Sequence, residues 1–429
     1  MEKQAILAIG IFLLTYAFII SEKVHRTIVA MIGGMLMVGL SVVNQETALH
    51  HVDFNTLGLL AGMMIIVAIT GETGLFKYVA VIAAKKAKGD PLKILISLGI
   101  ITAVFSALLD NVTTVLLMVP VTFSITRQLK VNPEPYLITE IISSNIGGTA
   151  TLIGDPPNIM IGSAVKELSF MSFINNLALI SAVTLIVTLV ILFLLYRKQL
   201  TTTEELKAGL MRLDETEELK DKALLKRCLL VLGLTIIGFF LHQLLHLESA
   251  TVALGGAFVL LLLTSKTEHE LEHAFNRVEW TTIFFFVGLF IVVSGLIETG
   301  IISSLARSAI EFTGGDIKIT AILILWLSAI ASAFVDNIPF VATMIPMIQD
   351  MGAMGIANLE PLWWSLALGA CFGGNGSLIG ASANLIVAGL AAQEGTHISF
   401  MRFFAVGFPL MLLSVLIATI YVYVRYLTV

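Results

Sequence analysis

The chain has 429 residues, of which 57% are hydrophobic and only 13% are charged, and its mean hydropathy is +0.95. Soluble proteins carry about 25% charged residues, so this composition excludes a soluble enzyme, a nucleic-acid-binding protein and a disordered chain. It predicts an all-α polytopic membrane protein in contact with the lipid bilayer. The net charge of −5 says little about partners, and the two cysteines form neither a metal-binding spacing nor a disulfide framework.

Eight apolar runs approach the length of about 20 residues that a bilayer crossing needs. They cover residues 4–20, 26–43, 54–70, 173–196, 229–246, 250–265, 280–297 and 403–427. The first run lacks the small-residue cleavage site of a signal peptide, so we interpret it as a span. Four further apolar regions are interrupted by Asp-Asn, Gly-Gly or Pro, which predicts hairpins at 93–125 and 318–350 and broken helices at 134–165 and 360–392.

We interpret the longest polar stretch, 197–228, as a charged cytoplasmic linker near the middle of the chain. We place the N-terminus outside, treat 93–125 and 318–350 as re-entrant hairpins, and let every other apolar region cross once. Cytoplasmic loops then carry 20 of the 25 Lys and Arg residues, as the positive-inside rule requires. We therefore expect an integral protein of a bacterial-type plasma membrane with both termini outside.

An internal repeat is the strongest organisational signal. Adding 226 to a residue number brings Asp110-Asn111 onto Asp336-Asn337, Gly147-Gly148 onto Gly373-Gly374, and Asn158 onto Asn384. We predict two inverted repeats, 1–196 and 229–429, each with five transmembrane helices and one re-entrant hairpin. An odd number of spans makes the copies antiparallel, as in secondary transporters whose site lies near the membrane midplane.

Each hairpin tip carries a carboxylate followed by an amide. The tips are 110–114 and 336–339. A charge at the centre of a membrane helix costs about 2.5–3.5 kcal/mol, so we expect Asp110 and Asp336 to serve a functional cavity, although capping of the second limb of each hairpin also explains them. With Asn111 and Asn337 they are the Na⁺ candidates.

The broken helices contribute glycines and side-chain oxygens at their turns. Unwound carbonyls and Asn, Ser and Thr oxygens are hard ligands suited to Na⁺, and glycine lets the backbone approach closely. Two such turns predict two cation sites beside one substrate position. The candidate binding residues there and at the first tip are Thr114, Asn145, Gly147, Gly148, Thr149, Asp155, Asn158, Gly373, Gly374, Asn375, Ser377 and Asn384.

Two acidic residues of the first half lack an acidic counterpart in the second. They are Glu140 and Asp155, and they could mark asymmetric proton handling, although an interhelical hydrogen bond explains Glu140 equally well. Neither a nucleophile–base pair nor a phosphate-binding Gly-Lys-Ser/Thr sequence is visible. We expect no enzyme activity, no nucleic-acid partner, and no cofactor beyond Na⁺ and/or H⁺ as coupling ions.

Segments 108–115, 145–158, 336–340 and 373–384 resemble the ArsB/NhaD branch of the ion transporter superfamily, and within it the bacterial relatives of the melanosomal P protein. The likeness runs from about residue 10 to 425. It implies a homodimer with a static scaffold and a transport domain that moves like an elevator. It also implies a site formed by two hairpin tips and two broken helices.

Carried over by position, the resemblance implies two cation sites. Ser106, Asn111 and the Gly147-Gly148 backbone would form one, and Ser332, Asn337 and 373–375 would form the other. Sodium-coupled dicarboxylate members carry Ser-Asn-Thr at each tip, where this chain has Asp-Asn-Val and Asp-Asn-Ile. The added carboxylates would repel a dianion and favour a site for a cation or an exchangeable proton.

The leading hypothesis is therefore an ion-coupled secondary active transporter that works by alternating access. Asp110 and Asp336 would bind Na⁺ or H⁺ in turn, as in Na⁺/H⁺ antiport of the NhaD type. The alternatives are Na⁺-coupled symport of a small organic or inorganic anion, such as citrate or a dicarboxylate, and an anion or arsenite efflux permease or channel. The sequence leaves the substrate, the stoichiometry and the direction of transport open.

Overall fold

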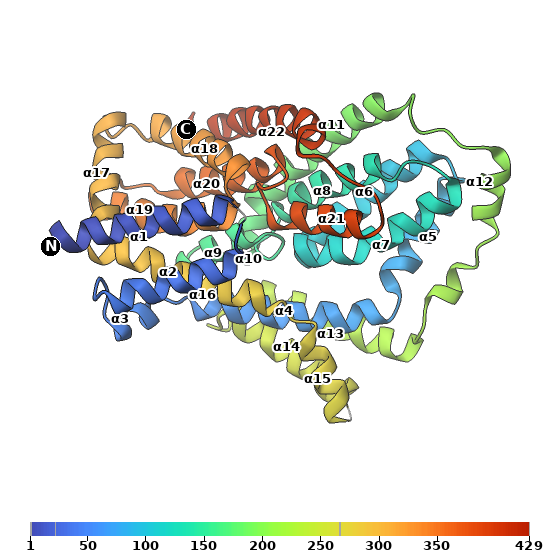
Figure 1. Ribbon diagram of the computed structural model, residues 1–429, viewed down its shortest axis with the longest axis horizontal. Helices are drawn as coiled ribbons and strands as arrows, with labels where there is room; N and C mark the ends of the chain where they lie inside the picture. The colour runs from blue at the N-terminus through green and yellow to red at the C-terminus, as the bar shows by residue number, and fades with distance from the viewer. Residues whose placement is uncertain (1, 22, 266, 429) are drawn as a thin grey trace.

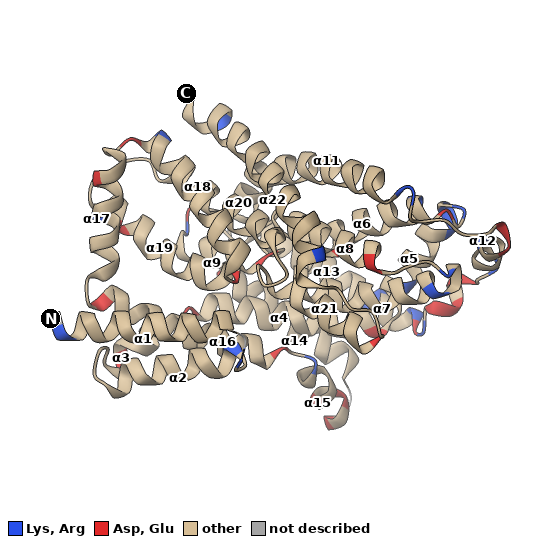
Figure 2. Ribbon diagram, turned by 45° about the horizontal axis from the view of Figure 1, so that its top comes forward, with Lys and Arg blue, Asp and Glu red and all other residues tan. Residues whose placement is uncertain are grey.

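The computed structural model describes residues 2–21, 23–265 and 267–428, and all regular structure in these ranges is helical. Nine of the described helices are long and apolar enough to cross a membrane, judged by length and composition. The predicted all-helical membrane class is therefore confirmed. Charged residues concentrate around α5 and α12, at one end of the long axis, while both termini lie toward the other end (Figure 2).

A lower layer of helices runs along the bottom of Figure 1. Two close helix crossings hold this layer together, α4 on α14 and α2 on α16. A Cβ atom on Gly62 would lie 2.6 Å from the backbone of Ala253, and one on Gly288 would lie 2.5 Å from the backbone of Ala30. Small residues thus allow both contacts. The helices of this layer are α1 (Glu2–Ser21), α2 (Arg26–Gly39), α3 (Gln45–His50), α4 (Phe54–Glu72), α13 (Lys222–Leu241), α14 (Ser249–Thr264), α15 (Glu268–Asn276) and α16 (Trp280–Glu298).

The remaining helices form an upper layer. Helices α6 and α7 lie in the right half of Figure 1, and α18 and α19 lie in the left half. The first half contributes α5 (Leu75–Lys86), α6 (Pro91–Leu108), α7 (Asn111–Leu129), α8 (Glu134–Gly148), α9 (Pro156–Ala164), α10 (Phe170–Phe173) and α11 (Leu179–Tyr196). The second half contributes α17 (Ile301–Thr313), α18 (Ile317–Phe334), α19 (Asn337–Ala353), α20 (Glu360–Gly373), α21 (Ser382–Gln393) and α22 (Phe400–Val422).

The four interrupted regions all contain paired helices. In each half two consecutive helices meet at the Asp-Asn tip, and a further pair is separated by an irregular turn after the Gly-Gly sequence. The limbs α6, α7 and α18 are as long as full membrane crossings, so the re-entrant character of these hairpins stays a prediction.

The segment between the halves is attached to the first half. It contains α12 (Glu204–Met211) and a short 3-10 helix at Glu215–Glu218, and α13 begins already at Lys222. Lys77 pairs with Glu218 at 2.6 Å, and Lys85 pairs with Glu215. The linker therefore lies against α5, and its last residues belong to the helix that follows.

Candidate functional site

The two predicted tip carboxylates are buried N-caps. Asp110 precedes α7 and accepts hydrogen bonds from the backbone N–H and the hydroxyl of Thr113, at 2.7 and 2.5 Å. Asp336 precedes α19 and accepts from the backbone N–H of Ile338 at 3.2 Å. Their relative exposures are 4% and 6%. The capping expected from sequence is thus present at both tips.

Asp336 has partners that Asp110 lacks. Arg26, in the first turn of α2, forms an ion pair with Asp336 and donates to the Ser382 hydroxyl at 2.7 Å. Ser382 also donates to Asp336, at 2.9 Å. This contact was not predicted from the sequence, because no local pattern links residues 310 positions apart.

Paired side-chain-to-backbone bonds hold each broken helix against its hairpin. The hydroxyls of Ser106 and Ser332 donate to the carbonyls of Ser144 and Ala370, at 2.6 and 2.7 Å. These donors lie 226 residues apart, as do their acceptors. The hydroxyl protons of the predicted site residues Ser106 and Ser332 are therefore engaged in these hydrogen bonds. Only the lone pairs of their oxygen atoms remain for a ligand.

The turns of the two broken helices are closed by amides. Asn158 donates to the carbonyls of Thr149 and Thr151 at 3.0 and 2.8 Å. Asn384 donates to the carbonyls of Gly374 and Ser377 at 2.7 and 2.8 Å. The side-chain oxygen of each amide accepts a bond from the other half of the molecule, Asn158 from the Cys371 thiol at 3.7 Å and Asn384 from Asn145 at 2.9 Å.

Asn145 joins the two halves. It accepts from Asn111 at 3.2 Å and donates to the side-chain oxygens of Asn375 and Asn384, both at 2.9 Å. Amide orientations are assigned from the hydrogen-bond network. The structure therefore brings predicted residues of the first tip and of both turns into one buried group. We call Asn111, Asn145, Asp155, Asn337, Asn375 and Asn384 the central polar cluster.

Asp155 is the carboxylate of this cluster. It is fully buried, and its Oδ1 accepts from Asn337 of the second tip at 3.3 Å. Among the described residues, no basic side chain forms an ion pair with Asp155, and its Oδ2 has no hydrogen-bond partner. Within the same described part of the chain, Asn111 Oδ1, Thr114 Oγ1 and Asn375 Nδ2 are also buried without a partner.

The cluster lies where four helices begin. The N-termini of α7, α9, α19 and α21 carry Asn111, Asp155, Asn337 and Ser382. Among the described residues no group of three His, Cys, Asp or Glu is placed to hold a metal ion. A cation here would therefore rely on one carboxylate with amide and hydroxyl oxygens, a hard donor set suited to Na⁺ or H⁺ rather than to a transition metal.

Two cavities with no lining residue in common lie beside the tips. One, of about 320 Å³, is lined by Arg26, Asp336, Ser382 and apolar side chains of α1 and α21. The other, of about 600 Å³, is lined by Thr113 next to the first tip and by Glu279 at the start of α16. The cluster therefore has a hollow beside each of its two hairpin tips.

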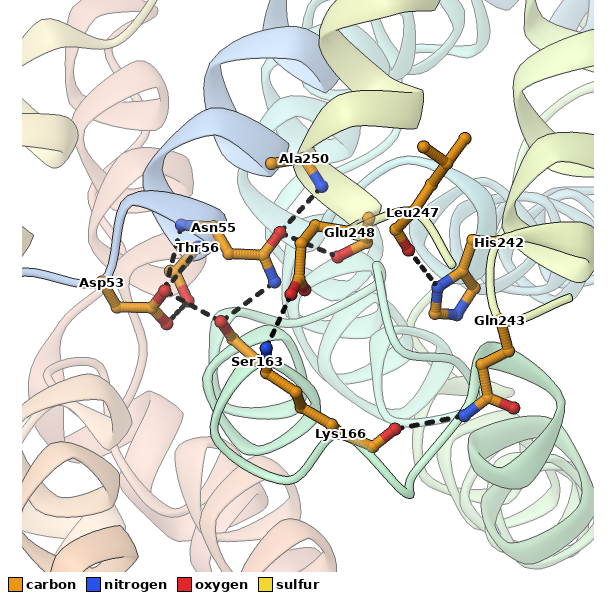
Figure 3. Close-up of polar contacts among 11 residues, drawn as sticks. Asp53, Asn55, Thr56, Ser163, Lys166, His242, Gln243, Leu247, Glu248 and Ala250 are labelled. Atoms are coloured by element: carbon orange, nitrogen blue, oxygen red, sulfur yellow. Dashed lines mark hydrogen bonds and ion pairs between the residues drawn. The ribbon is translucent and has the colours of Figure 1, made fainter. Parts of the chain in front are cut away.

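The far end of α9 is tied to the lower layer, as Figure 3 shows. Ser163 donates to Asp53 at 2.8 Å and accepts from Asn55 at 3.0 Å. Asn55 in turn accepts from the backbone of Ala250 at 2.9 Å. These bonds position α9, and with it Asp155, against α4 and α14.

Comparisons with known proteins agree on a class. The family model of citrate transporters matches residues 16–369. An uncharacterized transporter of Mycobacterium bovis is 42% identical over 99% of both chains. The human P protein is 36% identical over the whole of this chain, which spans 61% of that protein. The crystal structure of the Alcanivorax borkumensis YdaH transporter has a TM-score of 0.61 over 98% of each chain at 13% identity, a likeness of fold alone.

Proposed function

Because the chain belongs to the citrate transporter family, and is a membrane transporter and not an enzyme, we propose that it is an ion-coupled secondary active transporter. It works by alternating access, with Na⁺ and/or H⁺ as the coupling ion. The likeness to the P protein supports membership of the ion transporter superfamily. Placement in the ArsB/NhaD branch is part of the proposal.

The burial of Asp155 without a basic partner carries this proposal. An isolated ionised carboxylate in a protein interior costs several kcal/mol unless a positive charge or a proton neutralises it. The full penalty applies to Asp155, because this carboxylate is buried and forms no ion pair with a described basic side chain. The free oxygens of Asn111 and Thr114 supply further ligands. We therefore assign the principal coupling-ion site to Asp155, with Asp110 and Asp336 at its borders.

Matching helix bounds support the inverted-repeat proposal. The bounds of α16 are those of α4 displaced by 226 residues, and those of α18 are those of α6 displaced likewise. We propose that the hairpins and broken helices form a transport domain that moves as an elevator against the lower layer. Membership of the superfamily further suggests a homodimer, and the distribution of basic residues supports both termini outside and the linker in the cytoplasm.

We favour Na⁺/H⁺ antiport of the NhaD type as the mode of coupling. One carboxylate at Asp155 cannot hold Na⁺ and H⁺ at the same time, so the two ions compete. Among the described residues, the central polar cluster contains no Lys or Arg that could receive a multivalent anion. The second candidate is Na⁺-coupled symport of a small carboxylate. It is favoured by the family description and by Arg26 in the 320 Å³ cavity.

Proteoliposomes loaded with a pH-sensitive dye test both candidates. An imposed Na⁺ gradient should change the internal pH with the wild-type protein but not with Asp155→Asn. Asp316→Asn is the matched control, because Asp316 caps α18 outside the cluster and asparagine caps equally well. Uptake of labelled citrate that requires Na⁺, without Na⁺-driven proton movement, would select the symporter instead. Full ion coupling in Asp155→Asn would refute the assigned site.

A further inference from the structure

Arg26 is a charged bridge between the two layers at the second tip. Its side chain is 22% exposed, and it reaches from α2 to Asp336 and Ser382, which belong to α19 and α21. The guanidinium also lies 5.0 Å from the centre of the Phe285 ring. If the upper layer moves relative to the lower one, this bridge must break in every cycle.

A second carboxylate near Arg26 belongs to the lower layer, the same layer as α2. Glu279 immediately precedes α16, which packs along α2, and Thr27 next to Arg26 donates to the carbonyl of Thr281 at 2.7 Å. Glu279 interacts electrostatically with Arg26 and with Asp110 of the first tip. Its own hydrogen bond, from Thr282 at 3.1 Å, leaves acceptor capacity for a guanidinium. Arg26 therefore has an ion-pair partner in the upper layer, Asp336, and a second carboxylate close enough for electrostatic interaction in the lower layer, Glu279.

Resting on the ion-coupled transport proposed above, we propose that Arg26 is a gating residue that exchanges between Asp336 and Glu279. A coupling cation that reaches Asp336 takes over from Arg26, and Arg26 then pairs with Glu279. The charged contact between the tip and the lower layer is thereby broken only when a cation has arrived, while the hydrogen bond from Tyr16 of α1 to the Pro339 carbonyl, at 2.7 Å, is uncharged.

In both states of this exchange, the charged groups around the second tip keep partners of opposite charge. Removing one member of a buried ion pair is destabilising, because it leaves the other charge without a partner. Asp336 is only 6% exposed, so it retains a positive partner throughout. The other titratable groups facing it are Asp155, which interacts with it electrostatically, and His25, which lines the same cavity. With Glu279 ready to receive Arg26, neither charge is left alone.

The exchange predicts opposite effects of two neutral substitutions on Na⁺ affinity. Arg26→Gln removes the competitor and should lower the half-saturating Na⁺ concentration for transport by about tenfold, which corresponds to about 1.4 kcal/mol. Glu279→Gln removes the alternative partner, holds Arg26 on Asp336, and should raise that concentration. Arg26→Lys keeps the charge and should stay close to wild type. Arg402→Gln, which breaks the exposed pair with Glu134, is the matched control and should change nothing.

The measurement is Na⁺-driven flux in proteoliposomes, with each variant first checked for a monodisperse peak in detergent. Shifts of opposite sign for Arg26→Gln and Glu279→Gln support the exchange. Equal shifts, or lower rates at an unchanged half-saturating concentration, overturn it and leave Arg26 a structural residue. If Arg26→Gln does not fold, the direction of the Glu279→Gln shift decides. A wild-type protein without ion coupling would instead refute the proposed function.

Discussion

Replacing Gly147 with alanine tests how closely the broken helix α8 packs on the hairpin limb α6. A Cβ atom at this position would lie 2.2 Å from the carbonyl oxygen of Ala103 and 2.5 Å from its Cα. Ordinary contact begins at 3.4 Å, so α8 would have to withdraw by more than about 1 Å from a close-packed neighbour. Overpacking of this kind costs about 1–3 kcal/mol. We expect a destabilisation at the upper end of this range, because the added Cβ would meet backbone atoms of Ala103, which cannot rotate away as a side chain could.

Thermal unfolding in detergent, followed with a thiol-reactive fluorophore, measures this effect. Cys228 and Cys371 are both buried, so the dye reacts when the fold opens. Gly389→Ala in α21 is the matched control, because nothing lies within 4 Å of its added Cβ and alanine favours a helix by about 0.5–1 kcal/mol. We expect the midpoint to fall by several degrees only for Gly147→Ala. A midpoint within about 1 °C of the wild type would refute the close packing.

Three further outcomes follow from the same contacts. Gly373→Ala should destabilise the protein as Gly147→Ala does, because its Cβ would lie 2.5 Å from the carbonyl oxygen of Ala329; the same thermal assay checks this. Asn145→Ala should leave the amides of the central polar cluster without partners, lower the unfolding free energy by about 1–3 kcal/mol for each group left unsatisfied, and slow ion-coupled flux in proteoliposomes. The hydrogen bond from Lys85 lowers the pKa of Glu215 below its usual 4.5, so this contact contributes fully above pH 4.5 and is lost as the pH falls further. Hydrogen exchange at 215–218 should rise over that range, and tryptic cleavage near Arg212 should be faster at neutral pH in Lys85→Gln but not in the control Lys86→Gln.

Local sequence signals predicted the helices and the places where they are interrupted. Apolar length identified the spans, and Asp-Asn and Gly-Gly marked the tips and turns because these residues cap helices or permit close approach. The 226-residue offset recurs in matched contacts of Ser106 and Ser332, two residues that were assigned from the sequence to cation sites and not to these hydrogen bonds. Each of these features depends on the chemistry of a short segment.

The decisive contacts of the site could not be predicted in this way. Asn145 bonds to Asn375 across 230 residues, and Arg26 pairs with Asp336 across 310. Such contacts depend on how the two halves pack together, which no local pattern encodes. The asymmetry of Asp155 was visible in the sequence, but its bond to Asn337 and its lack of a basic partner among the described residues were not.

The meeting of four helix N-termini affects the charge balance of the proposed ion site. Each terminus is equivalent to about half a positive charge, so α7, α9, α19 and α21 together supply about two. Three of the four capping positions are aspartates, namely Asp110, Asp155 and Asp336, and the fourth is Ala381. With Arg26 on Asp336 these charges nearly cancel, and with Arg26 withdrawn they fall short of neutrality by about one positive charge. Under the exchange proposed above, a single monovalent ion would restore the balance, and the two cation sites predicted from the sequence would not both be filled in that state.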